Sequence, residues 1–262
     1  MDLAPNRHVA FERLHNFRDF GGYPAAEGRQ VRWGRLYRSE SLGKLAGADL
    51  AQFAGLGVRT VIDLRHSWEV DAGGRVPAAA GLEYRNLSIE HRPYDQSKLS
   101  DVIDPVRFLA DRYAEVASDG VAEIGQALRV IAEAGRAPLV IHCASGKDRT
   151  GMLAAIVLSL LGVDDEDIAA DYGLTGLATE RLIADWHAFY PGRELLWPHY
   201  GTAPPELMRV FLAELAGTFG SVRCYVTDYL GVSDRVIADL GRLYLADESL
   251  RAEGDDEALH AE

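Results

Sequence analysis

The stretch from 138 to 162 constrains the fold of this chain more than any other part of the sequence. The apolar run PLVI at 138–141 is typical of a short buried strand, and the polar stretch HCASGKDRTG follows it at 142–151. A helical apolar pattern continues from 152 to 162. A strand, a tight loop and a helix N-terminus in this order create an anion site, because free backbone N–H groups and the positive end of the helix converge there. The sequence therefore predicts an α/β unit with an anion-binding loop.

Strand-like and helix-like segments alternate through the rest of the chain. Strands are predicted at 59–64, 82–89 and 139–142. Helices are predicted at 45–56 and, with a break near 119–120, at 105–134, and the pattern from 166 to 244 is almost entirely helical. This alternation predicts an α/β fold, with a mainly parallel central sheet flanked by helices and a helical C-terminal part.

The 262 residues suit a single domain, which we expect to span 1–245. Within it, 166–218 is a candidate helical insert or lid, because aromatic residues, two prolines and a glycine interrupt the helical pattern at 189–200. The favoured alternative is an ordinary connection between helices whose aromatic residues pack into the core. The segment 246–262 holds seven acidic residues and one arginine, so it is expected to be a disordered acidic tail.

Composition excludes several classes of function. The formal net charge of −13 argues against general nucleic-acid binding. No apolar run reaches the roughly 18 residues of a membrane span, and the N-terminus lacks the apolar core of a signal peptide. Two cysteines are expected to be reduced thiols, as in a cytoplasmic protein, with non-classical export left open. No further ligands lie near the loop at metal-binding spacing, so neither a metal nor a cofactor is expected.

Cys143 and Arg149 enclose the five loop residues that are predicted to bind an oxyanion. A thiolate is a strong nucleophile, and helix N-termini and nearby cations stabilise it. The planar guanidinium group of an arginine matches two oxygens of a phosphate group at once. We therefore expect Cys143 to attack phosphorus and Arg149 to hold the oxygens. The predicted phosphate-binding residues beside them are Ala144, Ser145, Gly146, Lys147 and Thr150.

Three residues have expected supporting roles. Gly146 can adopt backbone angles that turn the loop N–H groups inward. The hydroxyl group of Thr150 could stabilise the sulfur as it leaves, and His142 could orient the loop. Other interpretations of the loop are a buried, inert cysteine or a nucleotide-binding P-loop. The second needs Ser or Thr after the lysine, where Asp148 stands.

The loop resembles that of the Cys-x5-Arg phosphatases, and HCxxGKDRTG in particular is similar to the atypical bacterial protein tyrosine and dual-specificity phosphatases. Further blocks that resemble this family follow in the expected order: NFRDFGGY at 16–23, LYRS at 36–39, DLR at 63–65 with Glu69 after it, and YLGVS at 229–233. The resemblance implies a Cys-x5-Arg phosphatase-like fold. It also implies a metal-independent phosphoric monoester hydrolase that acts on phosphotyrosine, often on phosphoserine or phosphothreonine, and in some members on phosphoinositides.

Asp148 is the proton donor that the resemblance suggests, because the leaving group needs a proton from a positioned carboxylic acid. Its alternative role is to brace the loop as an ion-pair partner of Arg149 or Lys147.

Other aspartates compete for this role. Asp63 ends a predicted strand and could face the same crevice, or it could cap a helix or brace Arg65. Asp101 or Asp104 could act from a separate mobile loop. The expected order is Asp148, then Asp63, then the loop aspartates.

Lys147 is one of only three lysines beside twenty-four arginines. It adds a cation to the loop and resembles the lysine of phosphoinositide phosphatases, where added charge suits a multiply charged head group. The alternative is a solvated lysine that balances Asp148. For the segment 16–23 we expect a supporting hairpin without a catalytic role.

Two other classes of function remain open at this point. A sulfurtransferase also uses an activated loop cysteine, and a catalytically silent module could bind phosphate without turnover. The Lys-Asp-Arg-Thr ending of the loop argues against the first, and a complete set of Cys143, Asp148 and Arg149 argues against the second. The expected partner is a phosphorylated protein or a phosphoinositide substrate, and the oligomeric state is not predicted.

Overall fold

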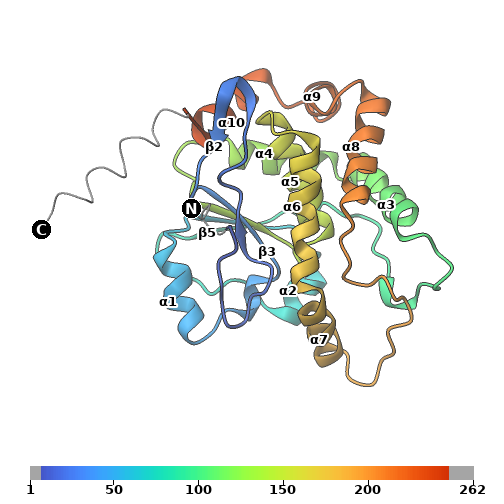
Figure 1. Ribbon diagram of the computed structural model, residues 1–262. Coiled ribbons are helices and arrows are strands. Elements are labelled where there is room, and N and C mark those ends of the chain that lie inside the picture. The colour runs from blue at the N-terminus through green and yellow to red at the C-terminus, as the bar shows by residue number, and fades with distance from the viewer. Residues whose placement is uncertain (1–6, 248–262) are drawn as a thin grey trace, which may run out of the picture.

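The computed structural model describes residues 7–247, and a five-stranded sheet forms the centre of this part of the chain (Figure 1). The strand order is β1-β3-β6-β4-β5. Only β1 runs antiparallel to its neighbour; the other pairs are parallel. The strands are β1 (Arg18–Asp19), β3 (Leu36–Ser39), β4 (Thr60–Asp63), β5 (Glu83–Asn86) and β6 (Leu139–His142). The predicted α/β fold with a mainly parallel sheet is confirmed.

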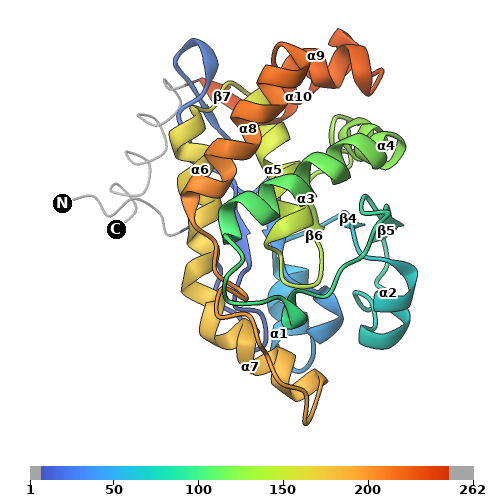
Figure 2. The same cartoon turned by 90° about the vertical axis from the view of Figure 1, so that its right-hand side faces the viewer.

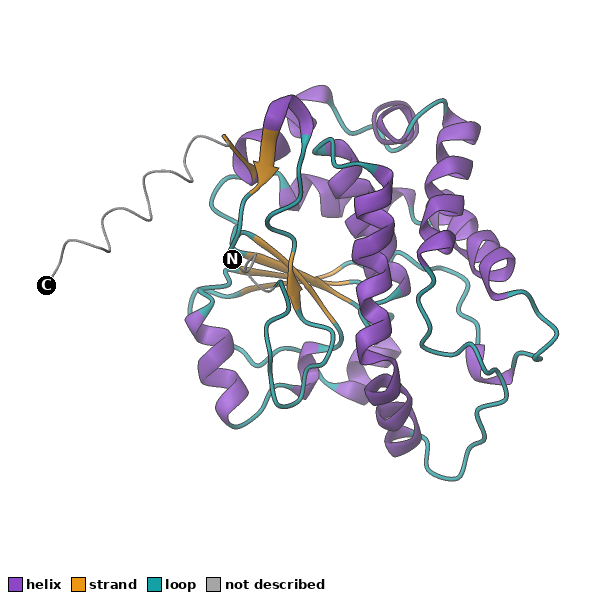
Figure 3. Cartoon of the chain, viewed as in Figure 1, coloured by secondary structure: helices purple, strands orange, loops and turns teal. Residues whose placement is uncertain are grey.

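Alternating side chains send the sheet's apolar residues into two separate cores. Val61 and Val140 pack in one core with Phe53 of helix α1 (Ala48–Gly55). Their neighbours Ile62 and Ile141 point to the other face, because successive side chains of a strand alternate. The helices α3 (Pro105–Asp119), α4 (Val121–Ile131) and α5 (Asp148–Leu160) contribute to this larger core. The sheet is therefore covered on both faces, as is usual for parallel sheets (Figure 3).

The C-terminal part is helical, as predicted. Helix α8 packs against both α3 and α6 on the side of the larger core (Figure 2). The helices are α6 (Asp165–Gly173), α7 (Thr179–Phe189), α8 (Pro205–Phe219), α9 (Val222–Cys224) and α10 (Asp234–Tyr244), with the short turns η4 (Leu174–Ala178) and η5 (Tyr225–Tyr229). None of the helices within 7–247 is long and apolar enough to cross a membrane.

The connection from α7 to α8 contains the aromatic interruption that the sequence shows at 189–200. Trp197 is completely buried and packs against Phe108 of α3 with ring centroids 6.2 Å apart, whereas Phe189 is half exposed. Leu196 N donates a hydrogen bond to Ser97 O at 2.9 Å. This connection is therefore anchored on the loop that precedes α3. The division of the chain into a domain with an insert or lid at 166–218 stays a prediction.

The last described residues form a strand where the sequence predicts the start of an acidic tail. Ala246 and Asp247 belong to β7 (Leu245–Asp247), which pairs antiparallel with β2 (Arg29–Val31). The prediction that the tail starts at Ala246 is wrong by these two residues, because charge composition carries no information on the free edge of β2 that they satisfy. Residues 248–262 of the predicted tail lie outside the described part of the chain.

Candidate active site

The loop 143–147 connects β6 to α5 at the carboxyl edge of the sheet. β6 is the central strand, with β3 and β4 on either side. Cys143 follows this strand directly and is buried, with 1% of its surface exposed. Asp148 is the first residue of α5, so the loop ends at a helix N-terminus. The predicted succession of strand, loop and helix is confirmed, and it lies where open α/β sheets bind their ligands.

Four consecutive carbonyl groups of the loop, from Ala144 to Lys147, each accept a hydrogen bond. The donors are Ser41 N to Ala144 O at 3.0 Å, Asn16 Nδ2 to Ser145 O at 2.9 Å, Arg38 Nη2 to Gly146 O at 2.9 Å, and Gly151 N to Lys147 O at 2.7 Å. In a planar trans peptide the next N–H points opposite to the C=O. The N–H groups of residues 145–148 are therefore turned away from these donors, and none of them binds another residue within 7–247. These four N–H groups are therefore free to bind an acceptor on the other side of the loop.

Gly146 is required for this loop geometry in two ways. Its φ of +70° lies in the left-handed region that favours glycine. A Cβ atom at this position would also lie 2.5 Å from Ser39 O. The expectation that Gly146 adopts unusual backbone angles therefore agrees with the structure, and the close approach of β3 adds a second reason.

The back cluster, consisting of Arg18, Arg38 and Asp171, lies behind the loop. Both guanidinium groups bind the one carboxylate: Arg18 Nε lies 3.1 Å from Asp171 Oδ1, and Arg38 Nη1 lies 2.5 Å from Oδ2. All three side chains are buried. Burial would raise the pKa of Asp171, but the two arginines lower it to about 2. Burial and the charge of Arg38 lower the pKa of Arg18 to about 10.

The back cluster was not predicted from the sequence, where 16–23 was expected to be a supporting hairpin only. A signal was present, since Arg18 and Arg38 stand in strand-like segments whose apolar neighbours are core residues. A buried charge needs a partner of opposite charge. The partner, Asp171, lies more than 130 residues away in the sequence and has no local signature.

Arg149 is held by two carboxylates. Its Nη1 and Nη2 atoms donate to Glu69 Oε2 at 2.5 Å and Glu69 Oε1 at 2.9 Å. Glu90 Oε2 lies 3.6 Å from Arg149 Nε. We call Arg149, Glu69 and Glu90 the front cluster. Burial opposes the charge of Arg149, but Glu69 and Cys143 raise its pKa above the ordinary value.

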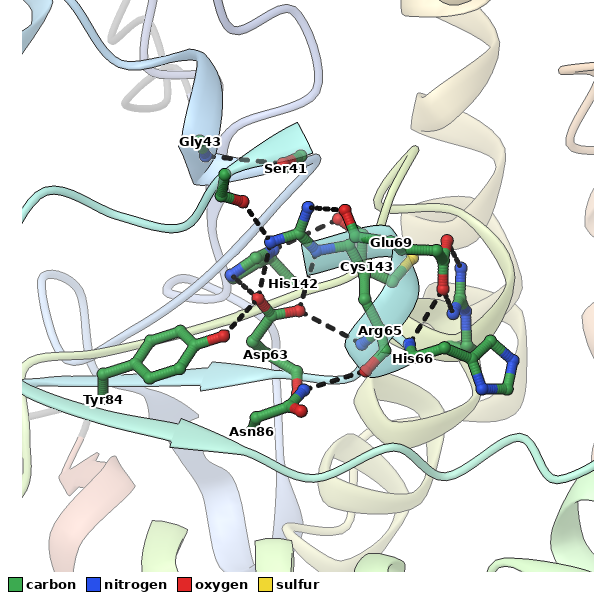
Figure 4. Close-up of polar contacts among 12 residues, drawn as sticks. Ser41, Gly43, Asp63, Arg65, His66, Glu69, Tyr84, Asn86, His142 and Cys143 are labelled. Carbon is green, nitrogen blue, oxygen red and sulfur yellow. Dashed lines mark hydrogen bonds and ion pairs between the residues drawn. The ribbon is translucent and has the colours of Figure 1, made fainter. Parts of the chain in front are cut away.

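Glu69 is positioned by the start of helix α2 (Ser67–Gly73), where it also accepts a hydrogen bond from His66 N at 2.9 Å. In Figure 4 a dashed line joins Glu69 to the backbone of His66. Burial would raise the pKa of Glu69, but its bonds to Arg149 hold it below the ordinary value. The sequence analysis noted Glu69 as part of a motif and assigned it no role, and it did not identify Glu90 at all.

A pocket of about 100 Å³ lies beside the loop, and Asp148, Arg149 and Glu90 line it together with Tyr94 and Tyr113. Asp148 Oδ1 accepts a hydrogen bond from Tyr113 Oη at 2.6 Å. The side chain of Asp148 keeps 20% of its surface exposed. Asp148 thus has a carboxylate in the pocket, next to the arginine predicted to bind phosphate.

The alternative proton donors lie elsewhere. Asp63 is completely buried and binds Arg65 Nη2 at 2.7 Å and Tyr84 Oη at 2.8 Å (Figure 4). Burial would raise its pKa, but His142 and Arg65 hold it below the ordinary value. Asp63 braces Arg65, one of the two alternatives considered, and the idea that it donates protons is not supported by this geometry.

Asp101 and Asp104 are also remote from the pocket. Asp104 caps α3 by accepting from Val106 N at 2.9 Å, and the Asp101 carboxylate binds Ser100 Oγ. Neither residue lines the pocket. Asp104 has a structural role at this position, because a carboxylate at a helix start satisfies free N–H groups.

Lys147 is buried rather than solvated, so that alternative is wrong. Its Nζ atom donates to Thr202 O at 3.0 Å and lies 3.5 Å from Asp148 Oδ1. The lysine therefore ties the loop to the connection between α7 and α8. This contact could not be predicted from composition, because Thr202 is a distant residue that contributes only its backbone.

His142 and Thr150 are both buried next to the loop. His142 Nδ1 lies 3.2 Å from Cys143 O, and burial lowers the pKa of His142. Thr150 Oγ1 has no hydrogen-bond partner in the described part of the chain. Their predicted supporting roles stay predictions. Cys143 and Cys224 are both free thiols, and no cluster of potential metal ligands occurs among residues 7–247.

Comparisons with known proteins agree with the resemblance in the sequence. A family model described as "Tyrosine phosphatase family" matches residues 9–246. The "Putative tyrosine-protein phosphatase H16_A0669" of Cupriavidus necator is 36% identical over 63% of this chain and 62% of its own. The "Triple specificity protein phosphatase PtpB" of Mycobacterium tuberculosis is 31% identical over 60% of this chain and 65% of its own. The chain thus spans less than two thirds of the length of these relatives. The crystal structure of TpbA from P. aeruginosa covers 71% of this chain at 18% identity, with a TM-score of 0.30.

Proposed function

We propose, on the premise that the chain belongs to the tyrosine phosphatase family, that it hydrolyses phosphotyrosine in proteins through a phosphocysteine intermediate. The reaction needs no metal and no cofactor. The proposed partners are phosphorylated protein substrates, and nucleic acids are not among them.

The observation that carries this proposal is the orientation of the loop backbone. All four carbonyl groups from Ala144 to Lys147 accept hydrogen bonds, so each of the four N–H groups that follow points away from the donor of its peptide and has no partner of its own within 7–247. Preorganised N–H groups stabilise the charge that develops on phosphate oxygens without reorganising during the reaction. Ala144, Ser145, Gly146, Lys147 and Thr150 are the proposed phosphate-binding residues, and Lys147 contributes through its backbone.

The first step forms the bond between sulfur and phosphorus. The Cys143 thiolate attacks phosphorus, the bond to the ester oxygen breaks, and Asp148 gives its proton to the leaving phenoxide. Arg149 binds two oxygens of the transferring group through donors that Glu69 leaves free. In the second step water attacks the phosphocysteine, Asp148 takes the proton, and inorganic phosphate leaves. Dividing one displacement into two steps lowers the barrier of each.

Hydrolysis of an aryl phosphate in EDTA tests this proposal, with wild type compared with Cys143→Ser. We expect turnover that survives chelation and disappears in the variant. Turnover that persists in Cys143→Ser would contradict the proposed nucleophile. Folded, reduced wild type without turnover would favour the silent binding module, and transfer of sulfur to cyanide would favour the sulfurtransferase.

A broader specificity is the second candidate. One relative is named a triple specificity phosphatase, which supports testing phosphoserine, phosphothreonine and phosphoinositide substrates. Recognition of a lipid head group by Lys147 is not part of this proposal, because its ammonium group is buried against Thr202 O. We therefore expect wild type and Lys147→Ala to have equal activity on a phosphoinositide. We also propose a cytoplasmic location, on the grounds that both cysteines are free.

A further inference from the structure

We propose that Glu90 sets the affinity of the phosphate site: its carboxylate competes with the substrate's phosphate group for Arg149, so that oxyanion affinity depends on the charge of Glu90. This inference rests on the proposed function, since it concerns the same phosphate site.

The donors of Arg149 divide into two sets. A guanidinium group has five N–H donors, and one from Nη1 and one from Nη2 bind the two oxygens of Glu69. The Nε atom instead faces Glu90 Oε2 at 3.6 Å. Glu90 and Arg149 both line the pocket, and Glu69 is not among the lining residues. The pocket side of the guanidinium group is therefore the side next to Glu90.

The contacts of Glu90 are weak for a buried carboxylate. Its Oε2 atom lies 3.6 Å from Arg149 Nε and 3.5 Å from His66 Nε2, both beyond the usual length of an N–H···O hydrogen bond. The side chain nevertheless keeps only 12% of its surface exposed. By contrast, Glu69 makes two short bonds to the same arginine. Glu90 thus lines the pocket beside Arg149 without being fixed there by strong bonds.

The charged groups around Glu90 come from several elements. Asp148 and Glu69 are like charges, Arg149 and Arg112 are opposite charges, and His66 lies against the carboxylate. Burial, Asp148 and Glu69 raise the pKa of Glu90 above its ordinary value, although Arg149 opposes this. Burial also lowers the pKa of His66, which keeps this neighbour neutral over more of the pH range.

A dianionic phosphate bound to Arg149 would stand next to the Glu90 carboxylate, and like charges at short distance repel strongly in a partly buried site. Protonation of Glu90 removes this repulsion and provides an O–H donor. The affinity for an oxyanion should therefore be highest at mildly acidic pH, and it should fall as pH rises through the raised pKa of Glu90.

Sulfate is the probe, because its charge does not change across the neutral and mildly acidic range. Its affinity is measured by calorimetry as a function of pH, in a Cys143→Ser background that removes the titration of the thiol. At neutral pH we expect Glu90→Gln to bind sulfate about tenfold more tightly, which corresponds to about 1.4 kcal/mol. The variant should also lose most of the pH dependence. Glu90→Asp keeps the charge on a shorter side chain, so it should retain the pH dependence with a smaller gain.

Glu133→Gln is the matched control, since Glu133 is half exposed and pairs with Arg136 on the surface. Its sulfate affinity should equal that of the background protein. Unchanged or weaker sulfate binding by Glu90→Gln would overturn the proposal. If sulfate binding is unchanged and Glu90→Gln with intact Cys143 loses turnover only on substrates with poor leaving groups, the proposal is also overturned. That result would assign Glu90 to proton transfer.

Two measurements together, aryl phosphate hydrolysis and the sulfate titrations, separate this proposal from the proposed function. Absence of aryl phosphate hydrolysis in the protein with intact Cys143 would remove the phosphatase assignment, while the sulfate titrations would still decide the competition at Arg149. Hydrolysis together with identical titrations of Glu90→Gln and its background would retain the phosphatase and reject the role of Glu90.

Discussion

The back cluster and the front cluster contain the same types of group in opposite proportions. Behind the loop, two arginines share the single carboxylate of Asp171. In front of it, the single guanidinium group of Arg149 lies between Glu69 and Glu90. One cluster therefore has an excess of positive charge and the other an excess of negative charge.

The two excesses are compensated by different means. The spare N–H groups of Arg38 bind loop carbonyl groups, which are permanent dipoles that do not titrate. In the front cluster the second carboxylate can be neutralised by a proton, and burial together with Asp148 and Glu69 raises the pKa of Glu90, although Arg149 and Arg112 oppose this. The comparison suggests a rigid support behind the loop and a titratable, adjustable charge in front of it.

The largest expected effect is on the back cluster. Asp171→Asn leaves two buried arginines without their counter-ion, and breaking a buried pair in this way costs about 3–5 kcal/mol. Urea denaturation at neutral pH measures the loss in the free energy of unfolding. Glu166→Gln removes a carboxylate of an exposed ion pair on the same helix and should give no measurable loss.

The pH dependence of the difference in stability between wild type and Asp171→Asn tests the charge of Asp171. Its pKa is lowered from 3.8 to about 2 in the folded protein, so its contribution to stability is present above the unfolded value and is lost as pH falls through about 2. The difference in unfolding free energy between wild type and Asp171→Asn should therefore narrow below about pH 4. A constant difference down to pH 2 would mean that Asp171 is not charged in the fold.

In the front cluster, Glu69→Gln should impair the phosphate site, whereas Glu90→Gln should strengthen its binding of an oxyanion. It weakens the bonds that fix Arg149, and misplacement of a catalytic group by about 1 Å costs roughly a hundredfold in rate. Steady-state kinetics on an aryl phosphate should show this loss mainly in kcat. Glu214→Gln is the control, because Glu214 makes a similar two-bond pair with Arg107 on the surface. Equal kcat values for wild type and Glu69→Gln would refute a positioning role.

Gly146→Ala tests the loop 143–147, which lies between the two clusters. The left-handed backbone costs an alanine about 1–2 kcal/mol, and its Cβ atom would lie 2.5 Å from Ser39 O. We expect a loss of about 2 kcal/mol of stability and a weaker affinity for sulfate, because the loop N–H groups are displaced. Gly217→Ala, at a position in α8 with open space around it, should be neutral or stabilising. Wild-type sulfate affinity in Gly146→Ala would show that the loop tolerates a different backbone.

Lys147→Met gives the smallest expected effect. The substitution removes the hydrogen bond to Thr202 O but also the cost of burying an ammonium group, so the net loss should be about 1 kcal/mol. Limited proteolysis should show faster cleavage between α7 and α8. Lys98→Met replaces an exposed lysine in the same way and should change neither property. If both variants resist cleavage equally, the contact with Thr202 does not restrain the connection.

Local patterns were sufficient to predict much of the fold. The break near 119–120 separates α3 from α4 as predicted, because Gly120 ends one helix and precedes the next. The buried strands at 60–63 and 139–142 were found as apolar runs. The pairing of β2 with β7 was not predicted, since it joins residues that are more than 200 positions apart. It depends on the free backbone groups at the edge of β2 and not on a local hydrophobic pattern.

The amino-acid sequence by itself determined the strand, loop and helix around Cys143 and Arg149, because this unit depends on periodicity and spacing between neighbours in the chain. The tertiary structure alone decided the partners of its charged groups. Arg149 meets Glu69 and Glu90, and Lys147 meets Thr202, only because the sheet order and the helix packing bring distant segments to the same edge. An ion pair depends on distance in space, and local sequence patterns contain little information on which distant charges will meet.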